Sequence, residues 1–166
     1  MKILYAIPAM LAALTIVPSH AHDIIRHANP NLPIATSVMV PAGADMLFVS
    51  GTLADLANPS APAGSIERFG DTATQAKSVF AKIAKELAAA GFTMGDVVKM
   101  NVFIVGDPRK GGVMDFEGLM QAYVHVYGLR PLEKSLPART TLQVAGLPVP
   151  GALVEIEVIA ARHAAH

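Results

Sequence analysis

Cysteine is absent from the 166-residue sequence, and neither sign of charge is in excess. Without cysteine the chain can form no disulfide, no thiolate metal site and no cysteine nucleophile. The 13 basic residues balance 13 acidic residues, so there is no basic field that would attract nucleic acid regardless of its sequence. Apolar residues are plentiful, with 52% of the chain hydrophobic and 16% charged. This composition predicts a globular chain of one domain.

The first 21 residues have the three parts of a secretory signal peptide. Lys2 supplies a positive start, residues 3–17 are almost wholly apolar, and small residues precede a cleavage site after Ala21. The apolar run of about 15 residues is shorter than the ~20 that a spanning helix needs. We therefore predict a signal peptide at 1–21, a single mature domain at 22–166, and a periplasmic or secreted location. A buried N-terminal helix or a retained membrane anchor is the alternative.

Hydrophobic periodicity divides the mature chain into strands and helices. Helices are predicted after Asp71 and Asp115, both favourable N-caps, and they end at Gly91 and Gly128. Strands are predicted at 37–40, 46–50, 98–104, 140–144 and 153–160. The order β-β-α-β-α-β-β predicts an α+β fold in which both helices cover one face of a mixed sheet. The other face would then be buried against another subunit.

Few polar residues are arranged for catalysis. No pair of histidines after residue 21 has the spacing that places two metal ligands on one helix face, so no metal site is predicted. The segment 107–110 is interpreted as a solvated turn rather than an anion site. Arg139 is different, because it opens a strand directly after Pro137-Ala138 and its guanidinium could hold a carboxylate by two parallel hydrogen bonds. Spacing alone favours the alternative, a cross-strand salt bridge between Arg139 and Glu155 that contributes little.

The segment around Arg139 resembles a known family signature. Residues 136–148, LPARTTLQVAGLP, followed by VEIEVIA at 154–160, resemble the C-terminal signature of the RidA/YjgF family. Further matches are FVSG at 48–51, Gln75 and Gly91 of the first helix, and GDVVKMNVF at 95–103. The matches run from about residue 37 to residue 160 and leave the predicted signal peptide outside. On these residues the protein is identified as an exported member of that family.

This resemblance implies a chorismate-mutase-like fold and a homotrimer with clefts between neighbouring subunits. It implies hydrolytic deamination of small carboxylate substrates, the reactive 2-imino and enamine acids, to 2-keto acids and ammonia, with no cofactor and no metal. Arg139 and Glu155 would be the catalytic residues: Arg139 would bind the substrate carboxylate, and Glu155 would position or activate the attacking water. Ser50, Gly51 and Thr141 match substrate-binding positions, and Thr141 stands where many relatives have cysteine.

Two further substrate-binding positions depart from the deaminase pattern of the family. Ser37 stands where a tyrosine is usual, and Met120 stands where an asparagine is usual. Both changes remove a polar group, and Met120 makes the cleft more apolar. The alternative function is therefore a non-catalytic trimer of this family that binds a small carboxylate. The neutral charge argues against the ribonuclease role sometimes attached to the family, so we predict no nucleic-acid partner, and no membrane contact after cleavage.

Overall fold

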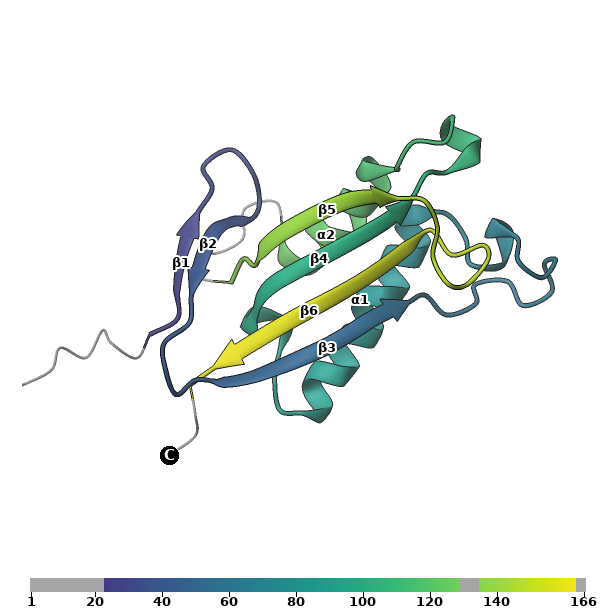
Figure 1. The fold of residues 1–166 in the computed structure, drawn as a ribbon. Coiled ribbons are helices and arrows are strands. Elements are labelled where there is room, and N and C mark those ends of the chain that lie inside the picture. The colour runs from purple at the N-terminus through teal and green to yellow at the C-terminus, as the bar shows by residue number, and fades with distance from the viewer. Residues whose placement is uncertain (1–22, 129–134, 164–166) are drawn as a thin grey trace, which may run out of the picture.

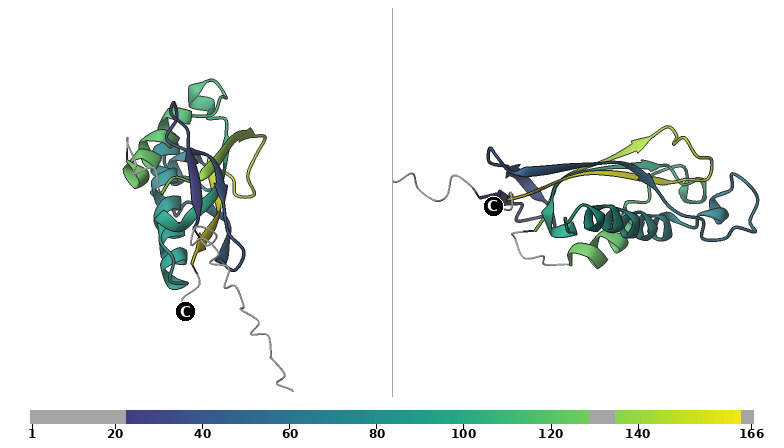
Figure 2. Two further views of the ribbon diagram at one scale, coloured as in Figure 1. Left: turned by 90° about the vertical axis from the view of Figure 1, so that its left-hand side faces the viewer. Right: turned by 90° about the horizontal axis from the view of Figure 1, so that it is seen from below.

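Six strands form one sheet, and two helices lie on one of its faces (Figure 1). The computed structural model describes residues 23–128 and 135–163. The layer of strands and the layer of helices are clearest in the view from below (Figure 2). Neither helix of the described residues is long and apolar enough to cross a membrane.

Four long strands form the wide part of the sheet. Their bounds are β3 Asp45–Leu53, β4 Val97–Val105, β5 Ala138–Val144 and β6 Val154–Arg162. β4 and β5 are parallel, whereas β6 is antiparallel to both β4 and β3. A ribbon of two short antiparallel strands, β1 (Ile25–Ala28) and β2 (Ala35–Met39), joins β5 through a single residue pair. The sheet order is β1-β2-β5-β4-β6-β3, and the ribbon stands at the left of Figure 1.

Apolar stripes on the helices bury the sheet face that they cover. α1 (Thr72–Ala89) contributes Val79, Phe80 and Ile83, and α2 (Phe116–Tyr127) contributes Leu119 and Tyr123. Each of these side chains is at most 2% exposed. The stripe recurs every three to four residues, which is the spacing that an α-helix requires of a single buried face.

Both helices begin at the predicted N-caps. The Asp71 carboxylate accepts a hydrogen bond from the backbone N–H of Thr74 at 2.8 Å, and Asp115 accepts one from Gly118 at 3.0 Å. The backbone hydrogen bond from Thr74 is the main reason that the pKa of Asp71 is lowered. After α1, Gly91 adopts φ +77°, the left-handed conformation that ends a helix and favours glycine.

The predicted α+β class, with a mixed sheet and both helices on one face, is confirmed, but the predicted order lacks one strand. β1 was missed because it has four residues and none of them is fully buried, so it carries no clear alternation. Contacts distant in the sequence hold it instead. The Arg26 guanidinium donates to the carbonyl oxygens of Val97 and Leu136, both at 2.7 Å, and of Gly95 at 3.0 Å.

The turn at 107–110 is a short 3₁₀ helix, Pro108–Lys110, and the prediction of a solvated turn is wrong for its first residue. The Asp107 side chain is 1% exposed and lies 2.8 Å from the Arg109 guanidinium. This hydrogen-bonded arginine is the main cause that lowers the pKa of Asp107. Two further short 3₁₀ segments lie at Ile66–Arg68 and Met94–Asp96.

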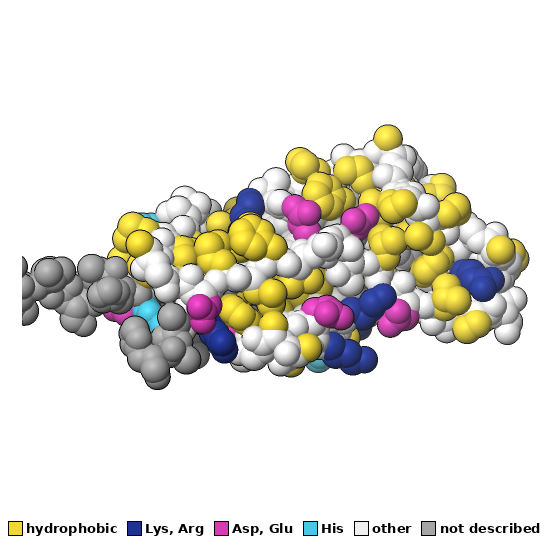
Figure 3. Space-filling view, turned by 60° about the horizontal axis from the view of Figure 1, so that its bottom comes forward, with side chains coloured by type: hydrophobic (Ala, Val, Ile, Leu, Met, Phe, Trp, Pro, Cys, Tyr) yellow, Lys and Arg dark blue, Asp and Glu magenta, His cyan; other side chains and the backbone are white. Residues whose placement is uncertain are grey.

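The sheet face opposite the helices carries exposed apolar side chains. Phe48 on β3 is 70% exposed and Leu142 on β5 is 50% exposed. Between them lies a polar pair, in which Asn101 donates to the Glu157 carboxylate at 2.8 Å. Hydrophobic side chains gather in patches among a few charged ones in the space-filling view (Figure 3). Such a face is suited to burial against another chain. The homotrimer stays a prediction, as does the signal peptide at 1–21, which lies outside the described residues.

Candidate functional site

Arg139 is the second residue of β5, and its side chain points toward α2. In the parallel pairing of β5 with β4, Arg139 is the partner of Met100, whose side chain is fully buried under the helices. Paired residues on neighbouring strands point to the same face of a sheet. The strand therefore fixes the base of Arg139 and directs its guanidinium to the helix-covered side.

Three side chains of α2 surround this guanidinium. Its Cζ atom lies 4.3 Å from the centre of the Tyr123 ring and 5.7 Å from that of Phe116. Its Nη1 atom lies 3.4 Å from the sulfur of Met120. Phe116, Met120 and Tyr123 follow one another at intervals of four and three residues, so the helix places them on one side. The Tyr123 ring is held in place by its hydroxyl, which donates to the Pro33 carbonyl at 2.8 Å.

The electrostatic surroundings of Arg139 are set by its burial and by its neighbours on α2. No carboxylate lies within ion-pair distance of it in the described parts of the chain. Burial lowers the pKa of Arg139, while the neighbouring Tyr123 acts in the opposite direction. Burial also raises the pKa of Tyr123 to about 12, so that the phenol is neutral at physiological pH. A guanidinium remains protonated despite such a shift. The arrangement is a half-buried cation that can accept an anionic ligand.

Thr141 lies two residues further along β5, on the same face as Arg139. Its hydroxyl is buried and has no hydrogen-bond partner among the described residues. A buried hydroxyl without a partner is unfavourable, because it has given up its hydrogen bonds to water. Such groups are uncommon in folded proteins, and a functional role is one of the explanations for them.

Glu155 is on the opposite face of the sheet. It pairs with Phe103 of β4 and with Leu53 of β3. It points away from the buried residues Val154 and Ile156 on either side of it. A Cβ atom on Gly51 would overlap the Glu155 carboxylate. Glycine is therefore required there for the carboxylate to keep this position.

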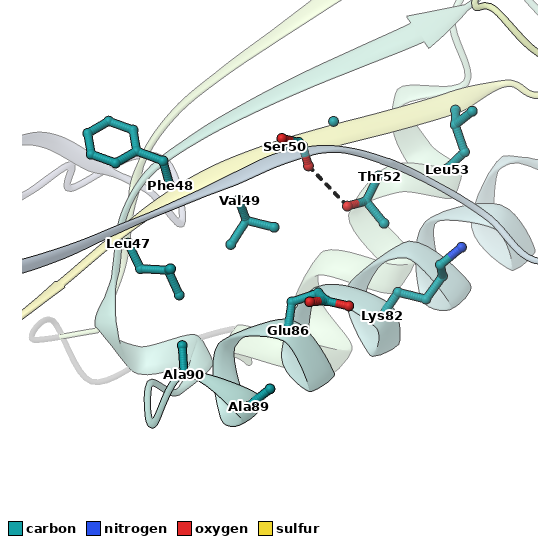
Figure 4. A pocket seen from close by; sticks show the side chains of 11 residues that line it. Leu47, Phe48, Val49, Ser50, Thr52, Leu53, Lys82, Glu86, Ala89 and Ala90 are labelled. Carbon is teal, nitrogen blue, oxygen red and sulfur yellow. Dashed lines mark hydrogen bonds between the residues drawn. The ribbon is translucent and has the colours of Figure 1, made fainter.

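Ser50 and Gly51 form an irregularity in the edge strand β3, where the register with β6 shifts between Val49 and Thr52. The Ser50 carbonyl accepts a hydrogen bond from the Thr52 hydroxyl at 3.1 Å. The two residues line an open groove of about 670 Å³ between β3 and α1. In Figure 4, Leu47 and Val49 point from β3 toward the helix, while Phe48 points to the other side.

The sequence-predicted residues thus fall into two groups that one chain does not bring together. Arg139, Thr141 and Met120 lie on the helix side of β5, and Glu155 with Gly51 lies on the open side of β6 and β3. The strand β4 lies between β5 and β6. The Arg139–Glu155 salt bridge that spacing alone favours is therefore not formed, and that interpretation is wrong.

Ser37 belongs to the β1–β2 ribbon rather than to either group. Its hydroxyl lies 2.8 Å from Nδ1 of His27, the residue paired with it across the ribbon. The side chain is exposed. In the described chain Ser37 therefore interacts with His27, a contact that the sequence did not indicate because β1 was not predicted.

Tyr123 and Phe116 are site residues that sequence reasoning missed. Both belong to the apolar stripe of α2, and an apolar residue at helical spacing does not by itself indicate a functional site. The signal that could have found them is the position of Met120, which lies between them on the same stripe and matches a family pocket position. Tyr123 is indeed fully buried, but its ring contacts the Arg139 guanidinium, and Phe116 is 42% exposed.

The sheet order and the two helices on one face define a YjgF-like α+β fold, which solved structures share. A Rid family protein of Yersinia pestis aligns with a TM-score of 0.56 and 21% identity, over 90% of this chain and 95% of that one. A protein of unknown function from Pseudomonas aeruginosa aligns with a TM-score of 0.55 and 27% identity, over 83% and 92%. A member of the YjgF/YER057c/UK114 family from Mycobacterium tuberculosis aligns with a TM-score of 0.50 and 20% identity, over 83% and 98%.

Sequence comparison gives the same result at the level of the family. The family model described as Endoribonuclease L-PSP matches residues 32–162. A RutC family protein of Pyrococcus horikoshii is 30% identical over 139 residues, which are 83% of this chain and 96% of that protein. The chain therefore belongs to the Endoribonuclease L-PSP family, which is the YjgF/RidA family.

Proposed function

We propose that the protein hydrolyses reactive 2-imino and enamine acids to 2-keto acids and ammonia, at a cleft between subunits of a homotrimer. The observation that carries the proposal is Arg139, a half-buried guanidinium with no carboxylate partner in the described chain. Its base is fixed by β5, so the fork can hold a substrate carboxylate by two charge-assisted hydrogen bonds. The reaction class is the one that the family resemblance of the sequence implies, and the proposal uses no cofactor or metal.

The reaction needs one water and one proton carrier. An enamine acid first tautomerises to the imine by moving a proton from nitrogen to carbon. Water then adds to the carbon of the C=N bond and gives a tetrahedral carbon that bears a hydroxyl and an amine. Loss of ammonia then forms the keto group. We assign two proton transfers to Glu155. It takes a proton from the attacking water and gives it to the nitrogen, and it then moves the hydroxyl proton to the same nitrogen as ammonia leaves and the C=O bond forms. A positioned base of this kind contributes roughly 10²–10⁴-fold.

Two subunits are needed to complete such a site. Because Arg139 and Glu155 lie on opposite faces of one sheet, they can act on one substrate if Glu155, with Ser50 and Gly51, comes from a neighbouring copy. The exposed apolar side chains of the open face support an assembly. So does β5, whose second edge pairs with β2 only at Ala138 in the described structure. Light scattering that gives a monomer at micromolar concentration would overturn this assembly.

We also propose that the protein works outside the cytoplasm, because residues 1–21 have the pattern of a cleaved leader. N-terminal sequencing of protein recovered from the periplasm should begin at His22. A chain that keeps its first 21 residues would contradict this location.

The second candidate is a trimer that binds a small carboxylate without turning it over. The contact of Met120 sulfur with Arg139, and the engagement of Ser37 by His27, favour it. At both positions the family usually has a polar side chain that could help to position a substrate. An endoribonuclease role, suggested by the family's description, has less support, because 13 basic residues only balance 13 acidic residues.

The test uses purified mature protein in an amino-acid oxidase reaction, with semicarbazide trapping the imine. Faster loss of the imine in the presence of the protein supports hydrolysis. Arg139→Ala should lose two hydrogen bonds of about 1.5–3 kcal/mol each, a loss of two orders of magnitude or more in rate or affinity. Arg139→Lys should be nearly as damaging, because an ammonium lacks the bidentate fork.

Glu155→Gln separates the two candidates. In an enzyme, turnover should fall while ligand binding persists, because the amide keeps the size of the carboxylate but cannot take a proton. In a binding protein there is no turnover to lose, and the substitution should change only stability or affinity. A normal rate in Arg139→Ala would contradict both candidates.

A further inference from the structure

Tyr123, Phe116 and Met120 form an apolar wall beside Arg139, and a ligand can reach part of it. Tyr123 is fully buried, and its hydroxyl is engaged by Pro33. Phe116, in contrast, is 42% exposed although its ring centre is 5.7 Å from the guanidinium carbon. Met120 is partly buried, with its sulfur against Nη1 of Arg139. The accessible surroundings of this cation are therefore a phenyl ring and a thioether.

The rings of Phe116 and Tyr123 do not take up the N–H donors of the Arg139 guanidinium. The N–H groups of a guanidinium lie in its plane, and aromatic rings interact with its face. A carboxylate consequently binds at the edge of the guanidinium, within reach of the α2 side chains that contact it. The thioether of Met120 is a weak acceptor and offers no strong hydrogen bond to a polar substituent. These surroundings favour an apolar substituent, because binding removes its surface from water.

We propose that this site selects 2-imino and 2-keto acids with a large apolar side chain, branched aliphatic or aromatic, over those with a small or polar one. Phe116 and Met120 are the specificity-determining residues. The proposal rests on the function proposed above, because it takes Arg139 as the carboxylate anchor. One methylene in an apolar pocket changes kcat/KM by about 10- to 200-fold, so several methylenes against the partly exposed side chains of Phe116 and Met120 should give about tenfold or more.

The first experiment compares two imines generated in place by an amino-acid oxidase, one from leucine and one from alanine. The mature protein should hydrolyse the leucine-derived imine with a kcat/KM about tenfold higher. Titration calorimetry with 4-methyl-2-oxopentanoate and with pyruvate, the two products, measures the same preference without turnover. The larger acid should bind at least about tenfold more tightly.

Two substitutions test the wall. Phe116→Ala removes the exposed ring, and Met120→Gln puts a polar amide on a chain of similar length. Each substitution should reduce, by about tenfold, the ratio of kcat/KM for the leucine-derived imine to kcat/KM for the alanine-derived imine. The main cause should be a higher KM for the larger substrate. Leu56→Ala is the matched control, because Leu56 is also 42% exposed and lies in the loop before α1. It should leave both rates and their ratio unchanged.

The outcomes separate this proposal from the function on which it rests. If no imine is hydrolysed but the larger 2-keto acid binds more tightly, and Arg139→Ala abolishes that binding, the hydrolase function fails and the selectivity stands. A ratio at or below one in the unaltered protein overturns the selectivity, as does a ratio that survives both substitutions. Failure of both 2-keto acids to bind overturns it too. If Phe116→Ala dissociates the oligomer, the ring packs on a neighbouring copy and the proposal is wrong.

Discussion

Two half-buried arginines allow the functional assignment of Arg139 to be tested through stability. Burial lowers the pKa of both Arg26 and Arg139, but their partners differ. Arg26 donates to three backbone carbonyls, at 2.7, 2.7 and 3.0 Å. Arg139 contacts two rings and a sulfur atom. Substitution of each by methionine, which is unbranched and similar in length, removes the charge and keeps most of the packing.

The expected costs are different. Hydrogen bonds to a charged group contribute about 1.5–3 kcal/mol, and water can replace part of those that Arg26→Met loses. We therefore expect a total loss of about 3 kcal/mol for that variant. Arg139→Met loses a cation–π contact of roughly 0.5–2 kcal/mol. It gains a sulfur–aromatic contact of about 0.3–1.5 kcal/mol and no longer desolvates an unpaired charge. Its free energy of unfolding should stay within about 1 kcal/mol of the original.

Urea unfolding at pH 7, followed by circular dichroism, measures both values. With a slope of about 2 kcal/mol per molar urea, the Arg26→Met midpoint should fall by about 1.5 M, and the Arg139→Met midpoint should barely move. Arg139→Met should nevertheless lose binding of 2-keto acids. If Arg139→Met is as destabilising as Arg26→Met, the Arg139 guanidinium is structural, and its assignment as an anchor is wrong.

Three further substitutions have definite expectations. The lowered pKa of Asp107 means that its stabilising contribution is complete above the unfolded value of about 3.9 and is lost as pH falls through the folded value. Asp107→Asn should therefore have a lower melting temperature than the original protein at pH 7, and the difference between the two should shrink at pH 3. An equal difference at both pH values would contradict this. Gly51→Ala should displace the Glu155 carboxylate and lower kcat. Its free energy of unfolding should stay within about 1 kcal/mol of the original, because the Glu155 side chain can move. An unchanged kcat would show that the position of Glu155 does not matter. Thr141→Val removes a buried hydroxyl without a partner among the described residues and should raise the melting temperature by about 2–4 °C in calorimetry; a lower value would mean that the hydroxyl has a partner.

The helices could be predicted from the sequence because their signals are local. Asp71 and Asp115 cap them, and the apolar stripe between cap and glycine repeats at the helical period. β1 could not be predicted in this way, because Arg26 binds carbonyls of residues 95, 97 and 136. Contacts at such a distance leave no periodic trace in four residues.

The position of Arg139 could also be predicted, but its relation to Glu155 could not. Alternation along β6 correctly placed Glu155 on the side away from Ile156. It could not show that β4 lies between β5 and β6, nor that the register pairs Arg139 with the buried Met100. Residues close in sequence on consecutive strands were assumed to be neighbours. The interleaved strand order separates them and assigns them to opposite faces.

The attachment of the ribbon also bears on how the chain folds. β1 is the first described strand to leave the ribosome, yet Arg26 binds the Leu136 carbonyl, 110 positions later. Ala35, likewise, donates its backbone N–H to the Pro137 carbonyl. The entropy cost of closing so long a loop grows with the logarithm of its length, and it is offset only once Leu136 and Pro137, which directly precede β5, are in place to accept these hydrogen bonds. The ribbon therefore docks late, after the part of the sheet that it joins. A chain arrested before residue 136 offers Arg26 only the carbonyls of Gly95 and Val97, and it lacks the Pro137 acceptor of Ala35.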